Sequence, residues 1–84
     1  MKRVLKSKLK ELGYKEIRTW YTYWRKEDIN LYIEDNEVSE HWVDVVLEIN
    51  NEQDFQELKD SISYYEEQLK IMQKDLEELK NVED

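Results

Sequence analysis

The residues in this sequence that could do chemistry are chiefly carboxylates, and they are concentrated in the middle of the chain. The stretch 27–57 spans 31 residues and contains eleven Asp or Glu and one His, with neither Lys nor Arg. Carboxylates can act as general acids and bases, can ligate cations, or can dock on a basic surface. The other residue types and their spacing decide which of these uses the sequence supports.

Catalysis and metal binding are not indicated. The chain has no Cys, and its one His, His41, has no identifiable nucleophile beside it. Adjacent carboxylates such as Glu34 and Asp35 are not diagnostic in a chain with 21 acids. The single Gly excludes a Gly-rich phosphate loop, and "EDNE" lacks the Gly and the distal Glu of a calcium loop. We therefore expect a non-enzymatic protein without a cofactor or a dedicated metal site.

Charge is divided unevenly along the chain. Residues 1–18 hold seven Lys or Arg against two Glu, whereas residues 19–84 hold six against nineteen acids. An acidic body repels the phosphates of nucleic acids and anionic lipids, so we expect neither direct nucleic-acid binding nor membrane binding. The expected partner is a basic surface, such as that of a nuclease or another nucleic-acid-handling protein.

The acidity has two interpretations. In the first, it is a solvated surface that keeps the protein soluble. In the second, carboxylates held on strands, loops and a helix imitate a phosphate backbone and block a nucleic-acid-binding protein. The second is favoured because the acids alternate with strand residues instead of forming a tail. The predicted partner-binding residues are Glu34, Asp35, Glu37, Glu40, Asp44 and Glu48, with Tyr32 and Trp42 as apolar anchors.

The elements that must position these residues form a predicted α+β domain covering residues 1–84. Residues 1–12 are predicted as a short basic helix, with Gly13 at its C-cap. Residues 14–49 are predicted as an antiparallel meander of three strands, because β-forming and alternating residues dominate there. These strands are Tyr14–Arg25, Ile29–Glu34 and His41–Ile49, with "EDNEVSE" as a turn.

Residues 51–80 are predicted as a long helix with a heptad repeat. The repeat, which we call the heptad seam, comprises Phe55, Leu58, Ile62, Tyr65, Leu69, Met72, Leu76 and Leu79. At ~1.5 Å per residue the helix is longer than a sheet of ~20–30 Å, so its C-terminal half must protrude, fold back or pack on another helix. The first half can pack on the sheet, and the N-terminal helix or a second copy can cover the rest. We favour a homodimer through this seam, from Leu58 onward.

The aromatic stretch "TWYTYWR" leaves one question of register open. Trp20 and Trp24 share one face of the predicted first strand, and Tyr21 and Tyr23 share the other. A shift of one residue in the first hairpin decides which pair joins the core. Either way, the second face collects large aromatics together with Tyr32 and Trp42. That face is covered by the N-terminal helix or a dimer mate, or it is a partner surface.

Composition favours a folded, cytoplasmic protein. Ten aromatics recur with clear periods, no Cys is present, and no apolar run approaches the ~18 residues of a membrane helix. The N-terminus "MKRVLKSKLK" lacks the apolar stretch of a signal peptide.

In size, acidity and element order the chain resembles small phage-borne inhibitors, including anti-CRISPR proteins that occupy the DNA-binding groove of Cas nucleases. The element order also resembles the double-stranded-RNA-binding domain in outline, but that family has a Lys-rich start to its last helix where this sequence reads "NNEQDFQELKD". We therefore expect an acidic inhibitor or regulator of phage or mobile-element type that acts as a DNA mimic. The alternative is a coiled-coil dimerisation or adaptor module whose acidity only gives solubility.

Overall fold

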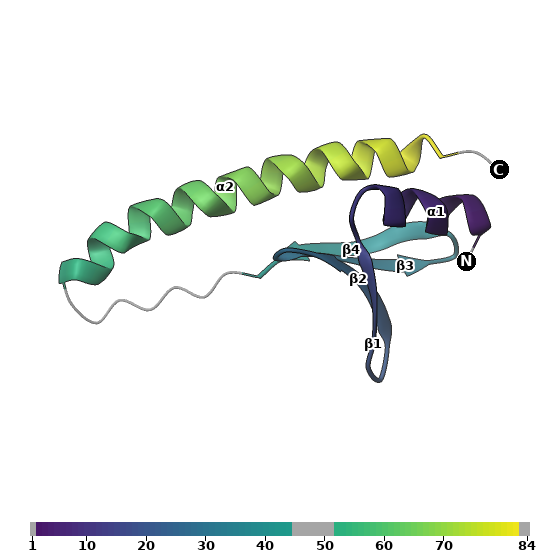
Figure 1. The fold of residues 1–84 in the computed structure, drawn as a ribbon, viewed down its shortest axis with the longest axis horizontal. Helices are drawn as coiled ribbons and strands as arrows, with labels where there is room; N and C mark the ends of the chain where they lie inside the picture. The colour runs from purple at the N-terminus through teal and green to yellow at the C-terminus, as the bar shows by residue number, and fades with distance from the viewer. Residues whose placement is uncertain (1, 45–51, 83–84) are drawn as a thin grey trace.

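The computed structural model describes residues 2–44 and 52–82 and has an α+β fold (Figure 1). A short N-terminal helix is followed by a four-stranded antiparallel sheet, in the order β1-β2-β3-β4, and by a long C-terminal helix. The elements are α1 (Arg3–Glu11), β1 (Lys15–Arg18), β2 (Thr22–Lys26), β3 (Ile29–Glu34), β4 (Glu37–Val43) and α2 (Glu52–Lys80). The predicted fold class is confirmed, whereas the predicted number of three strands is wrong.

Helix α1 ends at the predicted glycine. Gly13 has a φ of +101°, in the left-handed region that favours Gly. Its N–H donates to the carbonyl of Lys10 at 3.1 Å, and the N–H of Tyr14 donates to the carbonyl of Leu9 at 3.0 Å. These two bonds form a Schellman cap, which ends the helix and directs the chain into β1.

The region Tyr14–Arg25, predicted as a single strand, contains two strands joined by a tight turn. The hydroxyl and the N–H of Thr19 both donate to the carbonyl of Tyr21, at 3.1 and 3.0 Å. Trp20, between them, projects into solvent with 97% of its surface exposed. The turn contains no Gly, Pro, Asn or Asp, so the residue types that announce a turn in a sequence are missing.

The acidic segment "EDNEVSE", predicted as a turn, is mostly strand. Only Asp35 and Asn36 lie in the turn, with φ values of +55° and +64°. Two consecutive residues with positive φ form a two-residue hairpin loop, and Asp and Asn tolerate that conformation. Strand β4 therefore begins at Glu37, before the predicted start, and ends at Val43. Residues 45–49 of the predicted third strand lie outside the described residues.

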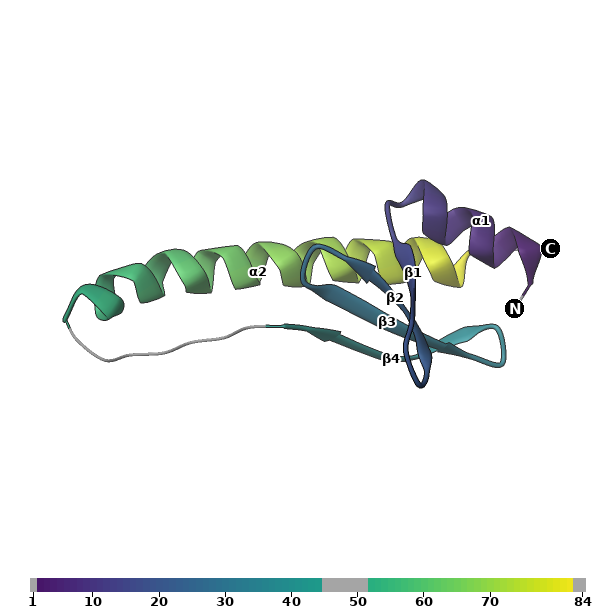
Figure 2. The ribbon, with the colours of Figure 1, turned by 60° about the horizontal axis from the view of Figure 1, so that its bottom comes forward.

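Both helices pack on one face of the sheet, which we call the inner face (Figures 1 and 2). The buried apolar residues of the core are Leu5, Leu9, Tyr14, Trp24, Ile29, Leu31, Met72 and Leu79. Trp24 is the largest fully buried side chain among them. Trp24 joins the core and its neighbour Tyr23 points to the other side of β2. The expectation that Trp24 and Trp20 join the core as a pair is wrong, because Trp20 lies in the turn and is exposed.

Helix α2 reaches the core through its C-terminal half, which corrects the interpretation that its first half covers the sheet. Met72 and Leu79 are buried, and Leu69 and Leu76 pack against the core. Ile62, in the first half, is 44% exposed. Figure 1 shows the reason: α2 begins beyond the end of the sheet and runs back toward α1, so its C-terminal half is the part that packs on the core.

The first half of α2 makes the molecule elongated. The radius of gyration is 15.2 Å, whereas a compact domain of this length has about 12 Å. No helix in residues 2–44 and 52–82 combines the length and apolar character needed to span a membrane.

Candidate functional site: the outer face of the sheet

The face of the sheet that points away from the helices, which we call the outer face, carries side chains suited to binding a partner. Side chains alternate along a strand, so the neighbours of buried Trp24 and Leu31 point outward. Tyr23, Tyr32 and Trp42 lie on this face, and neither described helix covers it (Figures 1 and 2). Strand alternation predicted this side for Tyr32 and Trp42.

Four aromatic rings form a continuous row across the outer face. The ring centroids of Tyr21 and Tyr23 are 5.4 Å apart, those of Tyr21 and Tyr32 are 6.2 Å apart, and those of Tyr23 and Trp42 are 6.1 Å apart. These separations fall in the range of attractive aromatic pairs. Tyr21 is 46% exposed and the other three are half-buried. This aromatic row (Tyr21, Tyr23, Tyr32 and Trp42) therefore presents ring surface to solvent.

Four of the predicted partner-binding carboxylates gather at the β3–β4 hairpin end, at the edge of the outer face. The register sets Tyr32 opposite Glu40 and Glu34 opposite Glu37, with an irregularity of register between the two pairs. Because a bulge inserts one residue, Glu37 and Glu40 point to the same face although they are three positions apart. Asp35 lies in the adjoining turn, and all four carboxylates are exposed. We call Glu34, Asp35, Glu37 and Glu40 the acidic rim.

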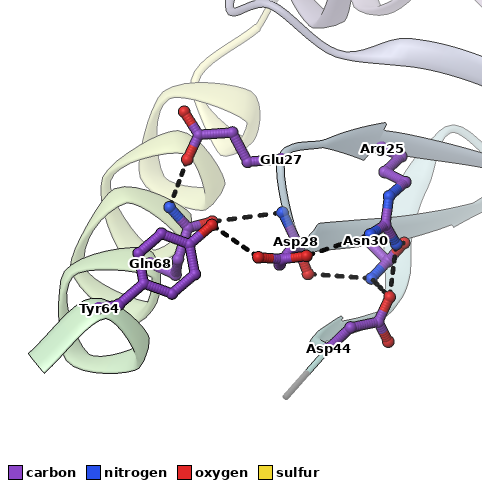
Figure 3. Close-up of polar contacts among 7 residues, drawn as sticks. All are labelled: Arg25, Glu27, Asp28, Asn30, Asp44, Tyr64 and Gln68. Carbon is purple, nitrogen blue, oxygen red and sulfur yellow. Dashed lines mark hydrogen bonds and ion pairs between the residues drawn. The ribbon is translucent and has the colours of Figure 1, made fainter. Parts of the chain in front are cut away.

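Asp44, also predicted to bind a partner, is bound within the protein. Its carboxylate accepts a hydrogen bond from the Arg25 guanidinium and another from Asn30 Nδ2 at 3.1 Å (Figure 3). Arg25 also donates to Asn30 Oδ1 at 2.9 Å and to Asp28 Oδ1 at 3.2 Å. The hydrogen bond from Arg25 holds the pKa of Asp44 below its usual value. Glu48, the remaining predicted acid, lies outside the described residues.

The turn between β2 and β3 fastens this network to α2. The Tyr64 hydroxyl donates to Asp28 Oδ2 at 2.6 Å, which raises the pKa of Tyr64 to about 12. Buried Gln68 accepts from the N–H of Asp28 at 3.4 Å and donates through Nε2 to Glu27 (Figure 3). The sheet is thus held to the helix by polar contacts as well as by the core.

Sequence reasoning did not identify Arg25, Asp28 and Asn30 as part of this face. The one available signal was Asn30, because Asn is disfavoured in strands and here stands between two aliphatic residues. A buried polar side chain needs partners, and Asn30 is 1% exposed. Its partner Asp44 is distant in sequence, so only the pairing of β3 with β4 brings the two together.

Acid is expected to remove the contribution of the Arg25–Asp44 pair to stability. Because the pKa of Asp44 is lower in the folded protein, the pair stabilises the fold above the ordinary Asp value of 3.8 and loses this effect as pH falls below it. The Asp44 side chain is 48% exposed, so the effect is small and screened by salt. In urea unfolding measured against pH, the difference between wild type and Asp44→Asn should shrink below that pH. A difference that stays constant in acid would contradict this assignment.

A second polar cluster lies inside the core and joins three elements. The Tyr14 hydroxyl donates to Asp75 Oδ2 at 2.8 Å. Lys26 Nζ donates to the same oxygen at 2.6 Å and to the carbonyl of Leu12 at 3.0 Å, and it lies 4.9 Å from the Tyr14 ring centroid. Burial, reinforced by the Asp75 contact, raises the pKa of Tyr14, so its hydroxyl remains a neutral donor. These contacts hold the α1–β1 turn, β2 and α2 together.

The fold divides the heptad seam between two environments. The C-terminal half is engaged in the core and comprises Leu69, Met72, Leu76 and Leu79. The described N-terminal half lies outside the core cluster and comprises Leu58, Ile62 and Tyr65. The side chain of Phe55 lies outside the described residues. Any contact of the seam with a second copy would therefore involve its first half.

His41, the one His of the chain, lies at the edge of an open cavity. It is exposed on β4, and the cavity has a volume of about 570 Å³ and lies beside the last turns of α2. Lys2 and Lys80 share the lining with two residues of the acidic rim, Asp35 and Glu37, which lie at the β3–β4 end of the sheet and border the cavity as well. Within the described residues, no three His, Cys, Asp or Glu side chains are grouped so that they could hold a metal ion.

No protein-family model matches this chain, and neither does any curated protein or solved structure. The site is therefore interpreted from its own geometry. That geometry combines an exposed aromatic row, an acidic rim beside it and an internally bound guanidinium on one sheet face. Exposed Tyr and Trp next to charged residues are typical of protein-binding surfaces.

Proposed function

We propose that this protein is a non-enzymatic acidic inhibitor or regulator of phage or mobile-element type. It acts in the cytoplasm, where its outer face docks on the basic nucleic-acid-binding surface of a host protein and competes with DNA. The observation that carries this proposal is the aromatic row beside the acidic rim on a sheet face that neither described helix covers. Tyr and Trp supply binding energy at protein interfaces, and carboxylates steer a partner with a basic surface.

Repulsion within the acidic rim favours the binding of a basic partner. Glu34 and Glu37 are directly opposite each other, and like charges facing across strands destabilise a sheet. Because strand pairing fixes the backbone of both residues, their carboxylates stay closer together than they would in a disordered tail. A partner that neutralises the rim relieves the repulsion, so binding also stabilises the folded protein.

Reversing two rim charges is expected to weaken partner binding by about tenfold or more. The variant is Glu37→Lys with Glu40→Lys on β4, where both side chains are exposed. Asp35 is left unchanged because its φ of +55° suits Asp. The matched control is Glu66→Lys with Glu67→Lys, which reverses two exposed carboxylates on α2. Binding is measured by titration with a partner captured from host lysate and eluted by duplex DNA at low salt.

The outcomes of this experiment separate docking from general acidity. A captured nucleic-acid enzyme that DNA displaces, and that binds the β4 variant weakly and the α2 variant normally, supports the proposal. Equal losses of affinity in both variants would mean that net charge, and not the position of the carboxylates, determines binding. If no basic protein is retained, or if the retained protein ignores DNA, the proposal is wrong.

A second candidate function is dimerisation or adaptor assembly through the first half of α2. Ile62 favours it, because this seam residue is 44% exposed. Ile62→Asp is expected to convert a dimer into a monomer, as measured by light scattering after size exclusion. Substitutions at Leu69 or Leu76 are unsuitable because these residues pack on the core. A wild-type protein that is monomeric at every concentration measured would exclude this function.

A further inference from the structure

The outer face places aromatic rings and carboxylates within reach of a single partner side chain. Tyr32 is directly opposite Glu40, and Trp42 is two positions from Glu40 on the same strand and the same face. A guanidinium is planar, stacks on aromatic rings and pairs with carboxylates in a fork, whereas an ammonium is compact and strongly hydrated. A surface that combines the two groups therefore suits Arg better than Lys.

The protein already holds one guanidinium on this face. Arg25 is bound there by Asp44, Asn30 and Asp28 (Figure 3), and it lies two positions from Tyr23 on the same face of β2. One terminal nitrogen of the guanidinium donates to Asn30 and Asp44, and the other donates to Asp28. This internal site shows that the sheet can present oxygen acceptors to a guanidinium beside the aromatic row.

We propose that the partner segment recognised by the outer face is extended and rich in arginine, an inference that rests on the proposed function. Its guanidinium groups stack on Tyr32 and Trp42 and pair with carboxylates of the acidic rim. Alternate side chains of an extended chain are about 7 Å apart, which is also the separation of alternate residues along β4. The two guanidinium groups of an Arg-x-Arg segment therefore have the same spacing as Trp42 and Glu40.

The test compares two peptides of equal charge. Fluorescein-labelled nona-arginine and nona-lysine are titrated with the full chain at the same ionic strength, and binding is followed by fluorescence anisotropy. Wild type is expected to bind nona-arginine about tenfold more tightly than nona-lysine, because stacking on the aromatic row adds to the shared charge attraction.

Variants then assign the preference to the outer face. Tyr32→Leu, alone and with Trp42→Leu, is expected to bring the two affinities within about twofold of each other. Glu37→Lys with Glu40→Lys should weaken both peptides. Trp20→Leu is the matched control, because this aromatic residue is 97% exposed and has no ring contact within the aromatic row. Circular dichroism checks that each variant is folded, and the single Tyr32 variant suffices if the double variant is not.

Each result has a distinct meaning. Equal affinity of wild type for both peptides, with losses when the rim charges are reversed, overturns the arginine preference and leaves the proposed basic partner intact. A preference that survives Tyr32→Leu also overturns the inference, because the aromatic row is then not its source. If neither peptide binds at low salt, or if reversal of Glu66 and Glu67 weakens binding as much as reversal of the rim, the proposed function fails as well.

Discussion

Replacing Asp75 by Ala is expected to lower the free energy of unfolding by about 3 kcal/mol. Asp75 is 3% exposed and accepts hydrogen bonds from both Tyr14 and Lys26. Its removal leaves an ammonium and a hydroxyl in the core without their common acceptor. Leaving buried donors unsatisfied lowers stability more than removing both partners of a pair does. The Lys26 side chain is 21% exposed, so the expected loss lies at the lower end of the usual range. Urea unfolding followed by circular dichroism measures it.

Two further variants test whether the loss comes from the broken pair or from lost volume. Asp75→Asn keeps an oxygen acceptor of similar size and should lose less than Asp75→Ala. The triple variant Tyr14→Phe, Lys26→Met and Asp75→Leu removes every member of the cluster, and such replacements are often neutral. It should therefore regain most of the stability that Asp75→Ala loses. A triple variant as unstable as the single one would show that polar interaction in this cluster contributes net stability.

Replacing Trp24 by Ala is expected to cost about 3–5 kcal/mol, which approaches the whole stability of a small domain. Trp24 is 1% exposed and is the largest side chain in the core formed by the sheet and both helices. Loss of its volume leaves a cavity that neighbouring strands, fixed by their pairing, cannot fill. We expect most Trp24→Ala molecules to be unfolded at room temperature, with a far-ultraviolet circular dichroism spectrum that reports the loss of α2.

The same hairpin offers a matched control for this prediction. Trp20 is 97% exposed in the turn, so Trp20→Ala should change stability by no more than about 0.5 kcal/mol. Trp24→Phe should cost less than Trp24→Ala for two reasons. It retains most of the volume, and it removes an indole N–H that is buried and has no hydrogen-bond partner within the described residues. Equal effects at the two Trp positions would contradict the assignment of Trp24 to the core.

The core and the outer face both depend on β2 and β3. Trp24 and Leu31 anchor the inner side of the sheet, while Tyr23 and Tyr32, one position away in each strand, lie on the outer side. A core substitution that disturbs strand pairing would therefore also disturb the aromatic row. For this reason, binding experiments should use substitutions on the outer face whose folding has been checked.

Local sequence was sufficient for the two helices. The spacing of Leu5 and Leu9 and the glycine that follows predict α1, because helix periodicity and a left-handed C-cap depend on near neighbours only. The heptad seam predicts α2 for the same reason, and both helices are present. Local sequence does not show which elements the helices pack against. That depends on the direction in which α2 runs past the sheet, and the second half of α2, not the first, reaches the core.

The sequence was insufficient for the hairpins. "TWYTYW" consists of β-forming residues throughout, so its break at Trp20 has no local signal. Because β1 pairs antiparallel with β2, the chain reverses between Arg18 and Thr22, and two bonds to the carbonyl of Tyr21 stabilise the turn. At Asp35 and Asn36 the residue types suit a turn, but its length of two residues follows from the pairing of β3 with β4.

The sequence by itself determined the acidity of the middle of the chain, the helical periods, and the side of the sheet on which Tyr32 and Trp42 lie, because charge and alternation are local properties. Only the tertiary structure decided that Trp24 is core and that Asp44 is bound to Arg25. It also decided that a bulge sets Glu37 and Glu40 on one face. These outcomes depend on strand register, which is fixed by contacts between residues far apart in the chain.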